Sequence, residues 1–218
     1  MNNGETVAIG WIDNGLVHGS FMASVIEILM QSQNTENPIT EVIRCPGLGR
    51  GNNRDRVIES WEKTESDWLL WIDSDMSPTF NHFKMLKEKA NKDTSPLVSG
   101  LYFGVNFFPN QELPITTPVA GSEKPIDLDV DHLQPISWAG LGFTLLHRNV
   151  IKLIKNKFGN DVKIHQQEIA DNTTSNDDIP FFSKAFESGI QPLIYAKVII
   201  PHIKSIPVGL EYHLGISK

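Results

Sequence analysis

Five apolar residues, Trp68 to Ile72, are followed directly by the polar sequence Asp73-Ser74-Asp75. A run this short, with aromatic and β-branched members, is typical of a strand that is buried on both faces. The pair Ser77-Pro78 forces a turn soon afterwards, so the two carboxylates lie where a buried strand reaches the surface. A strand of this kind needs covering layers on both sides, which favours an α/β fold.

The position of the two carboxylates allows two interpretations. In an open α/β sheet, ligands bind at the carboxyl ends of the strands. Asp73 and Asp75 would offer oxygen donors there that suit Mg²⁺ or Mn²⁺, above all a metal that also holds substrate phosphates. The alternative is a strand end followed by a helix cap, where Asp and Ser are also common. These residues alone leave both interpretations open.

Strand-like and helix-like segments alternate through the first half of the chain. The predicted strands are residues 6–12, 39–44, 68–72 and 95–103, and the predicted helices are residues 18–32, 53–63 and 80–86. This repetition predicts a Rossmann-like, doubly wound and mostly parallel sheet with right-handed crossovers. Residues 104–135 contain several prolines and only short strand-like pieces, which predicts a small antiparallel insert.

A glycine-rich, basic stretch precedes the second predicted helix, and Arg54 lies at its end. Glycines let the backbone approach a ligand, and arginines bind phosphates or planar bases. The stretch matches neither the dinucleotide fingerprint G-x-G-x-x-G nor a P-loop, because the sequence GK[ST] is missing. Arg54 is therefore a candidate ligand-binding residue without a fold-specific motif around it.

The second half of the chain begins with residues 136–147, where Trp138 precedes Gly140 and Gly142 and a buried strand is predicted at Phe143 to Leu146. Glycines within a strand often mark the close approach of a ligand. A helix is predicted over residues 149–158. The polar residues 159–177 follow, and a loop this long within a compact domain is usually functional or disordered.

Asp177 and Asp178 precede a predicted amphipathic helix. Its inward residues are predicted to be Ile179, Phe182, Ala185 and Phe186. Two acids at a helix N-terminus are the usual cap and dipole arrangement. The functional alternative is a carboxylate at the mouth of a site, where it acts as general base.

His202 directly follows a predicted strand, residues 192–200, as Asp73 and Asp75 follow theirs. Its side chain is therefore predicted to reach the same crevice. The simplest chemistry that uses all of these residues is displacement at a sugar carbon, with a nucleoside diphosphate as the leaving group. A metal held by Asp75 and His202 would neutralise the charge that develops on this diphosphate. An acid near the hydroxyl of the sugar acceptor would take its proton.

Length and composition narrow the classes of function. A chain of 218 residues is expected to form one domain, and its net charge of −7 disfavours a general nucleic-acid binder. The single cysteine, Cys45, excludes an internal disulfide and a cysteine-based zinc cluster. The sequence has no transmembrane-length apolar run and no signal peptide, so we expect a cytoplasmic protein. Its oligomeric state stays open.

Five segments together resemble the GT-A glycosyltransferases, in particular the small single-domain enzymes of the glycosyltransferase family 2 type. The segments are TVAIGWIDNG, NNRDRVIESW, WLLWIDSDM, WAGLGFTLLHR and NDDIPFFSKAFESGI. They resemble, in order, the nucleotide-entry strand, the arginine-led helix, the metal-binding DxD strand, the acceptor-side strand and the Glu-Asp-x-x-Phe helix of that family. Asp55 replaces an Asn and Asp177 replaces a Glu of the family pattern. The resemblance implies one GT-A domain over residues 1–218.

The resemblance also implies an activity. It implies transfer of a sugar from a nucleotide-diphosphate sugar, most commonly a UDP-sugar, to an acceptor hydroxyl, with Mn²⁺ or Mg²⁺ as cofactor. An acid at the position of Asp178 favours inversion, and the choice between inversion and retention stays open. Asp178 would be the catalytic base. The other implied site residues are Asp73, Asp75 and His202 for the metal, Ile12, Asp13, Arg54 and Ser74 for the nucleotide, and Trp138, Gly140, Gly142 and Asp177 for the sugar or acceptor. The acceptor stays open among glycans, proteins and small molecules.

Two other functions are weighed against this one. A sugar-nucleotidyltransferase also uses a doubly wound sheet and Mg²⁺-binding carboxylates. It usually has a glycine-rich basic loop straight after the first strand, where this chain reads WIDNGLVHG. The other is a non-catalytic module that binds a nucleotide or a carbohydrate. The intact Asp73-Ser74-Asp75, Asp177-Asp178 and His202 argue against such a module.

Overall fold

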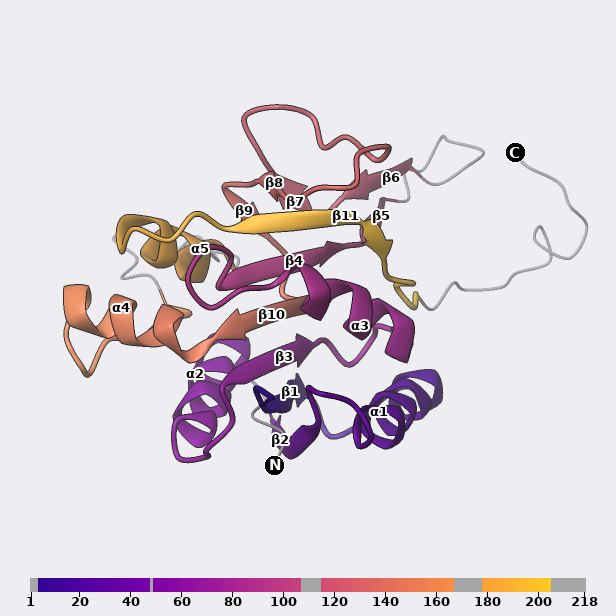
Figure 1. The fold of residues 1–218 in the computed structure, drawn as a ribbon, viewed down its shortest axis with the longest axis horizontal. Coiled ribbons are helices and arrows are strands. Elements are labelled where there is room, and N and C mark those ends of the chain that lie inside the picture. The colour runs from indigo at the N-terminus through magenta and orange to yellow at the C-terminus, as the bar shows by residue number, and fades with distance from the viewer. Residues whose placement is uncertain (1–3, 48, 107–114, 167–177, 205–218) are drawn as a thin grey trace, which may run out of the picture.

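The computed structural model describes residues 4–47, 49–106, 115–166 and 178–204. A seven-stranded sheet runs through it in the order β2-β1-β3-β10-β4-β11-β8 (Figure 1). The strands are β1 Val7–Asp13, β2 Ile39–Pro46, β3 Trp68–Ile72, β4 Leu97–Leu101, β8 Gln134–Pro135, β10 Phe143–His147 and β11 Leu193–Ile199. β1 pairs in parallel with β2 and β3, and β4 pairs in parallel with β11. The predicted α/β fold with a mostly parallel sheet is confirmed.

One central strand departs from the strand-helix repetition. β10 runs antiparallel to both of its neighbours, β3 and β4. A parallel neighbour needs a crossover connection, usually a helix. The chain enters β10 instead directly from the antiparallel insert, through Gly140 and Gly142, and so runs in the opposite direction. The Gly142 carbonyl accepts a hydrogen bond from the Asp73 N–H at 3.1 Å, which joins this entry to the end of β3.

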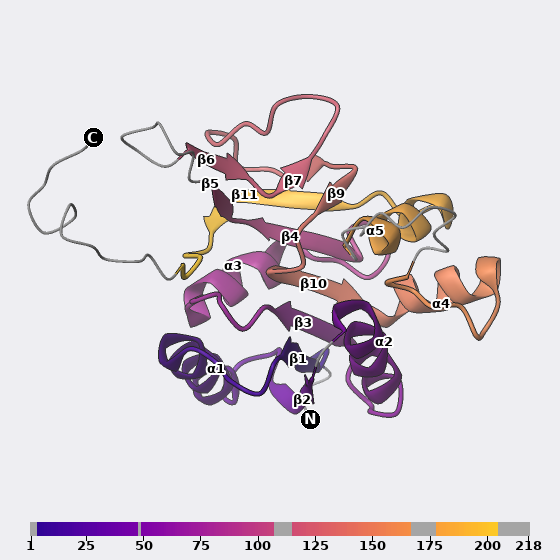
Figure 2. The same ribbon diagram turned by 180° about the vertical axis from the view of Figure 1, so that it is seen from behind.

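Helices cover both faces of the sheet (Figures 1 and 2). They are α1 Gly19–Ser32, α2 Arg50–Trp61, α3 Phe80–Lys89, α4 Arg148–Phe158 and α5 Asp178–Glu187. α1 and α3 pack on one core cluster together with Trp68, Leu70 and Ile72 of β3. α2, α4 and α5 pack on a second cluster together with Leu69 and Trp71. All five residues of β3 are buried, as a strand between two helical layers requires.

The predicted antiparallel insert is also confirmed. β5 Phe103–Asn106 pairs with β6 Ile115–Pro118, and β7 Ala120–Gly121 pairs with β9 Trp138–Ala139. β8 adds an antiparallel edge to β11. These short strands lie beyond the β11 edge of the sheet (Figure 1). No helix among the described residues is long and apolar enough to cross a bilayer.

The inward face of α5 matches the prediction at Phe182 and Ala185, which are buried, and differs from it at Ile179 and Phe186. Ile179 and Phe186 are 40% and 59% exposed, whereas Phe181 and Phe182 are buried. A helix of ten residues has few apolar positions that indicate which of its sides faces the core. The adjacent Phe181 and Phe182 are compatible with two such orientations of the helix. The observed orientation places Phe181 against the core and leaves Asp178 7% exposed on the same side.

Candidate active site

Several of the predicted site residues lie at one edge of the sheet because parallel strands end there. β1 ends in Asp13, and Asp73 directly follows its parallel neighbour β3. β11 brings the C-terminal segment to the same edge. The Ser77 N–H donates to the Pro201 carbonyl at 3.0 Å, and the Ile203 N–H donates to the Asp75 carbonyl at 2.7 Å. These bonds fix the turn after β3 beside His202.

The first group of charges consists of Arg54, Asp73 and Asp178. The Arg54 side chain is 3% exposed, and its Nη2 lies 3.2 and 3.4 Å from the two carboxylate oxygens of Asp73. Its Nη1 forms an ion pair with the Asp178 carboxylate. The guanidinium lies 5.6 Å from the centre of the Trp71 ring. One buried arginine thus joins α2, β3 and α5 through two carboxylates.

The second group consists of Asp75, His202 and Lys204. Asp75 Oδ2 lies 3.0 Å from His202 Nε2 and 3.0 Å from Lys204 Nζ. Burial acts to raise the pKa of Asp75, but the hydrogen bonds from His202 and Lys204 outweigh it and hold the pKa at about 2. Lys204 was not among the predicted site residues, because a lone lysine after a strand carries no recognisable pattern.

The orientation of His202 is informative about what Asp75 can bind. Its Nδ1 lies 2.9 Å from the Phe103 carbonyl oxygen, which can only accept, so Nδ1 carries a proton. Nε2 then donates to the Asp75 carboxylate at 3.0 Å. With a cation between them, Nε2 would lose this proton and offer its lone pair to the cation. Metal-binding histidines are commonly oriented in this way, by donating the other ring N–H to a backbone carbonyl.

The donor set fits a small divalent ion. Two adjacent ligands of an octahedral Mg²⁺ at about 2.1 Å lie about 3.0 Å from each other. Asp75 Oδ2 and His202 Nε2 have this separation, 3.0 Å. Among the described residues, however, no three His, Cys, Asp or Glu side chains could together hold a metal. Asp73, the third predicted ligand, is oriented toward Arg54 and accepts from Trp71 Nε1 at 3.3 Å.

Asp13 is held firmly at the end of β1. Its carboxylate accepts hydrogen bonds from Arg44 at 2.7 and 2.9 Å, from Trp11 Nε1 at 3.0 Å and from the Gly15 N–H at 2.8 Å. The Arg44 guanidinium lowers the pKa of Asp13. Arg44 lies on β2, opposite Trp11 in the parallel register, and was not predicted because only the pairing of β1 with β2 brings it there. Ile12, the neighbour of Asp13, is half-buried against the core on the α2 side.

The two glycines before β10 lie close to Tyr102. A Cβ on Gly140 would overlap the Tyr102 hydroxyl. A Cβ on Gly142 would lie 2.6 Å from both Met76 Cε and Tyr102 Cε1. The neighbour that requires these glycines is therefore a tyrosine side chain of the protein itself. The predicted contact of Gly140 and Gly142 with a sugar stays a prediction.

Tyr102 lies close to both charged groups, and it was not among the predicted site residues. Its ring contacts the His202 ring edge to face, at 5.1 Å and 83°. Burial raises the pKa of the Tyr102 hydroxyl, and the negative charges of Asp73 and Asp75 act in the same direction. The buried Tyr102 ring thus packs against His202. Its only sequence signature was a place at the end of a predicted strand.

Replacing Gly142 with alanine is expected to destabilise the protein. The added methyl would displace Tyr102 or Met76, and overpacking of this kind costs about 1–3 kcal/mol. For a chain of this size that loss lowers Tm by about 2–4 °C per kcal/mol. Gly19→Ala is the matched control, since no atom lies within 4 Å of a Cβ there. Calorimetry of both variants tests this, and an unchanged Tm for Gly142→Ala would contradict it.

The remaining predicted residues lie as follows. Trp138 is half-buried on β9, beside Gly121, where a Cβ would overlap the indole. Ser74 is half-buried in the turn between the two aspartates. Asp177 lies outside the described residues. The structure therefore brings together Arg54, Asp73 and Asp178, and separately Asp75 and His202.

No protein-family model and no curated protein sequence matches this chain. Solved structures do match it in fold. A197 from STIV superposes with a TM-score of 0.52 at 15% identity, over 94% of this chain and 98% of that one. GalNAc-T7, in a crystal structure with UDP, GalNAc and Mn²⁺, superposes with a TM-score of 0.54 at 10% identity. That match covers 94% of this chain but only 45% of GalNAc-T7, so this chain spans less than half of it. The chain thus has the fold of the GT-A glycosyltransferases.

Proposed function

We propose that this protein is a metal-dependent glycosyltransferase that uses a nucleotide-diphosphate sugar, with UDP as the first nucleotide to test. The observation that carries the proposal is the Asp75–His202 pair. Its 3.0 Å separation and the Nδ1–H bond to the Phe103 carbonyl fit two ligands of one Mn²⁺ or Mg²⁺. Such ions are usually held by one or two protein carboxylates together with substrate phosphates, so two protein ligands are sufficient.

The bound ion would neutralise charge that develops on the diphosphate leaving group. The residues of the chain supply the rest. Asp178, at the N-terminus of α5, accepts the proton of the acceptor hydroxyl as general base. Arg54 fixes the Asp178 carboxylate relative to Asp73 through its two ion pairs. The deprotonated acceptor oxygen would bond to the sugar carbon on the face opposite the diphosphate while the carbon–oxygen bond to the diphosphate breaks, and this single displacement inverts that carbon.

The comparison with GalNAc-T7 supports the choice of ligands. That protein has the same fold and was crystallised with UDP, GalNAc and Mn²⁺. In this chain, Asp13 and Asp73 lie at the ends of neighbouring parallel strands, the usual place for a nucleotide in such sheets. We therefore assign the base and ribose to the edge near Asp13, Ile12 and Ser74, and the sugar to the side of Trp138.

Calorimetric titration of the protein with UDP, with and without Mn²⁺, tests the proposal. We expect UDP to bind at least about tenfold more tightly with Mn²⁺, a difference of about 1.4 kcal/mol. UTP and ATP serve as comparison ligands. Equal UDP affinity with and without the metal would contradict the proposal and favour a binding module. Turnover of a nucleoside triphosphate with a sugar phosphate would identify a nucleotidyltransferase instead.

A further inference from the structure

Residues Ile164, His165 and Gln166, here named the 164–166 clasp, are built into the core although they belong to a polar stretch. Ile164 is 3% exposed and His165 is 2% exposed. The sequence predicted a polar loop in this region, and the burial of these two residues had no local signal. A buried histidine within a polar stretch raises the question of what it holds.

The clasp is bound to α2 through Asp55. Asp55 Oδ1 accepts from the N–H groups of Ile164 at 3.1 Å and His165 at 3.0 Å, and lies 3.0 Å from His165 Nδ1. Asp55 is itself 5% exposed and directly follows Arg54 in the helix. Buried carboxylates need such partners to offset the loss of hydration. Asp55, which replaces an Asn of the pattern that the sequence resembles, therefore binds the clasp to α2 in this chain.

The clasp also contacts β3, which leads into Asp73, and α5, which begins with Asp178. The His165 ring stacks on Phe181 of α5 at 5.2 Å and 14°, and lies 5.9 Å from the Trp71 ring of β3. Trp71 Nε1 donates to Asp73, and Phe181 lies one turn after Asp178. Lys184 of α5 donates to the carbonyls of Ile164 at 3.4 Å and Gln166 at 2.6 Å.

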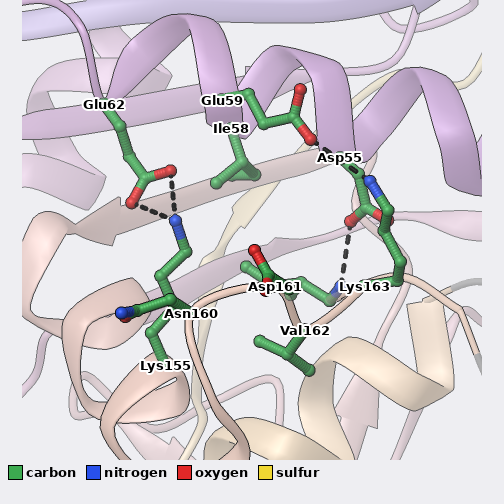
Figure 3. Close-up of a pocket in the computed structure, with 10 residues that line it drawn as sticks. Asp55, Ile58, Glu59, Glu62, Lys155, Asn160, Asp161, Val162 and Lys163 are labelled. Carbon is green, nitrogen blue, oxygen red and sulfur yellow. Dashed lines mark hydrogen bonds and ion pairs between the residues drawn. The ribbon is translucent and has the colours of Figure 1, made fainter.

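The contacts on the outer side of the clasp contribute less to holding it in place. A pocket of about 420 Å³ is lined by Asp55, Ile164 and the residues around them. Figure 3 shows Asp55 on one side of this pocket and Lys163 and Val162 on the other. Two ion pairs cross it, Lys155–Glu62 at 2.6 Å and Lys163–Glu59 at 3.3 Å. Partly exposed pairs of this kind stabilise a protein little. The buried contacts of Asp55 and His165 are therefore the ones that set the position of the clasp.

We propose that His165 is a positioning residue for the reaction. It lies among α2, β3 and α5. Arg54 lies on α2, Asp73 directly follows β3, and Asp178 begins α5, and His165 fixes the spacing of the three elements through Asp55, Trp71 and Phe181. The inference rests on the proposed function, since it concerns the placement of the catalytic base. A misplacement of about 1 Å at a reacting centre can cost about 10²-fold in rate, even when its cause lies away from the chemistry.

Two variants and a control test this. His165→Ala is expected to lower kcat about 10–100-fold while KM for the nucleotide sugar changes little, because positioning acts on the transition state. His165→Phe keeps a ring between Trp71 and Phe181 and is expected to recover part of kcat. Lys163→Ala removes a nearby exposed ion pair and should leave kcat unchanged. All rates are referred to the folded fraction, measured by circular dichroism.

A second measurement does not depend on activity. Hydrogen exchange in His165→Ala should become faster in α5 and at the end of β3, and stay unchanged in α1 and β2. An unchanged kcat in folded His165→Ala, or unchanged exchange in α5, overturns the proposal. If the wild-type protein transfers no sugar, the proposed function fails and the exchange measurement alone decides the role of His165.

Discussion

Asp178→Asn is expected to lower kcat for sugar transfer about 10³-fold, within the usual range for loss of a general base. The Asn side chain has nearly the same shape and retains an oxygen that can accept from Arg54, the partner of Asp178. It cannot take a proton from the acceptor hydroxyl. Binding of UDP with Mn²⁺ should stay within about threefold of wild type, a difference below 1 kcal/mol. The measurement is steady-state kinetics with a saturating donor, together with calorimetry.

The control for this variant is Asp129→Asn, which removes the same charge from an exposed position. Its kcat should equal that of the wild type. Because Asp178 is buried beside Arg54, the Tm of Asp178→Asn is measured as well, and kcat is referred to folded protein. Retention of more than about a tenth of wild-type kcat would exclude Asp178 as general base, given the usual size of that contribution.

Local patterns were sufficient to predict the framework of the sheet. β3 was recognisable because an all-apolar run ending in Asp-Ser-Asp is a property of adjacent residues. The direction of β10 was not predictable in this way, because strand direction depends on how the chain enters the sheet. The inward face of α5 was predicted correctly at Phe182 and Ala185 but wrongly at Ile179 and Phe186, for a related reason. Tertiary packing selects Phe181 over Ile179, and the short helix is compatible with both orientations.

The same division applies to the site. Asp75 and His202 each follow a strand, so their proximity could be predicted from the shared edge of the sheet. The partners that decide their roles come from elsewhere in the sequence. Tyr102 precedes the glycines that accommodate it by about forty residues, and His165 is more than a hundred residues from Asp55. Such pairings depend on the folded arrangement and leave no periodic signal in one sequence.

Asp75→Asn is expected to weaken Mn²⁺ binding in the presence of UDP by at least about 10²-fold, since even indirect partners of metal ligands change affinity 10–100-fold. The amide is a poorer ligand than the carboxylate and lacks the charge that Asp75 keeps down to a pKa of about 2. Sugar transfer should fall with metal occupancy and recover in part at high Mn²⁺. Calorimetric titration of Mn²⁺ at fixed UDP measures the affinity, again with Asp129→Asn as control.

Asp73→Asn separates the two aspartates of the motif. Asp73 contacts Arg54 and Trp71, whereas Asp75 contacts His202 and Lys204, so their loss should have different signatures. Asp73→Asn should disturb the Arg54–Asp178 arrangement and lower kcat more than it weakens Mn²⁺ binding. The opposite result, loss of Mn²⁺ binding in Asp73→Asn with full binding in Asp75→Asn, would transfer the role of direct ligand to Asp73. In that case the Asp75–His202–Lys204 contacts would tie the segment around His202 to the turn after β3 rather than form the metal site.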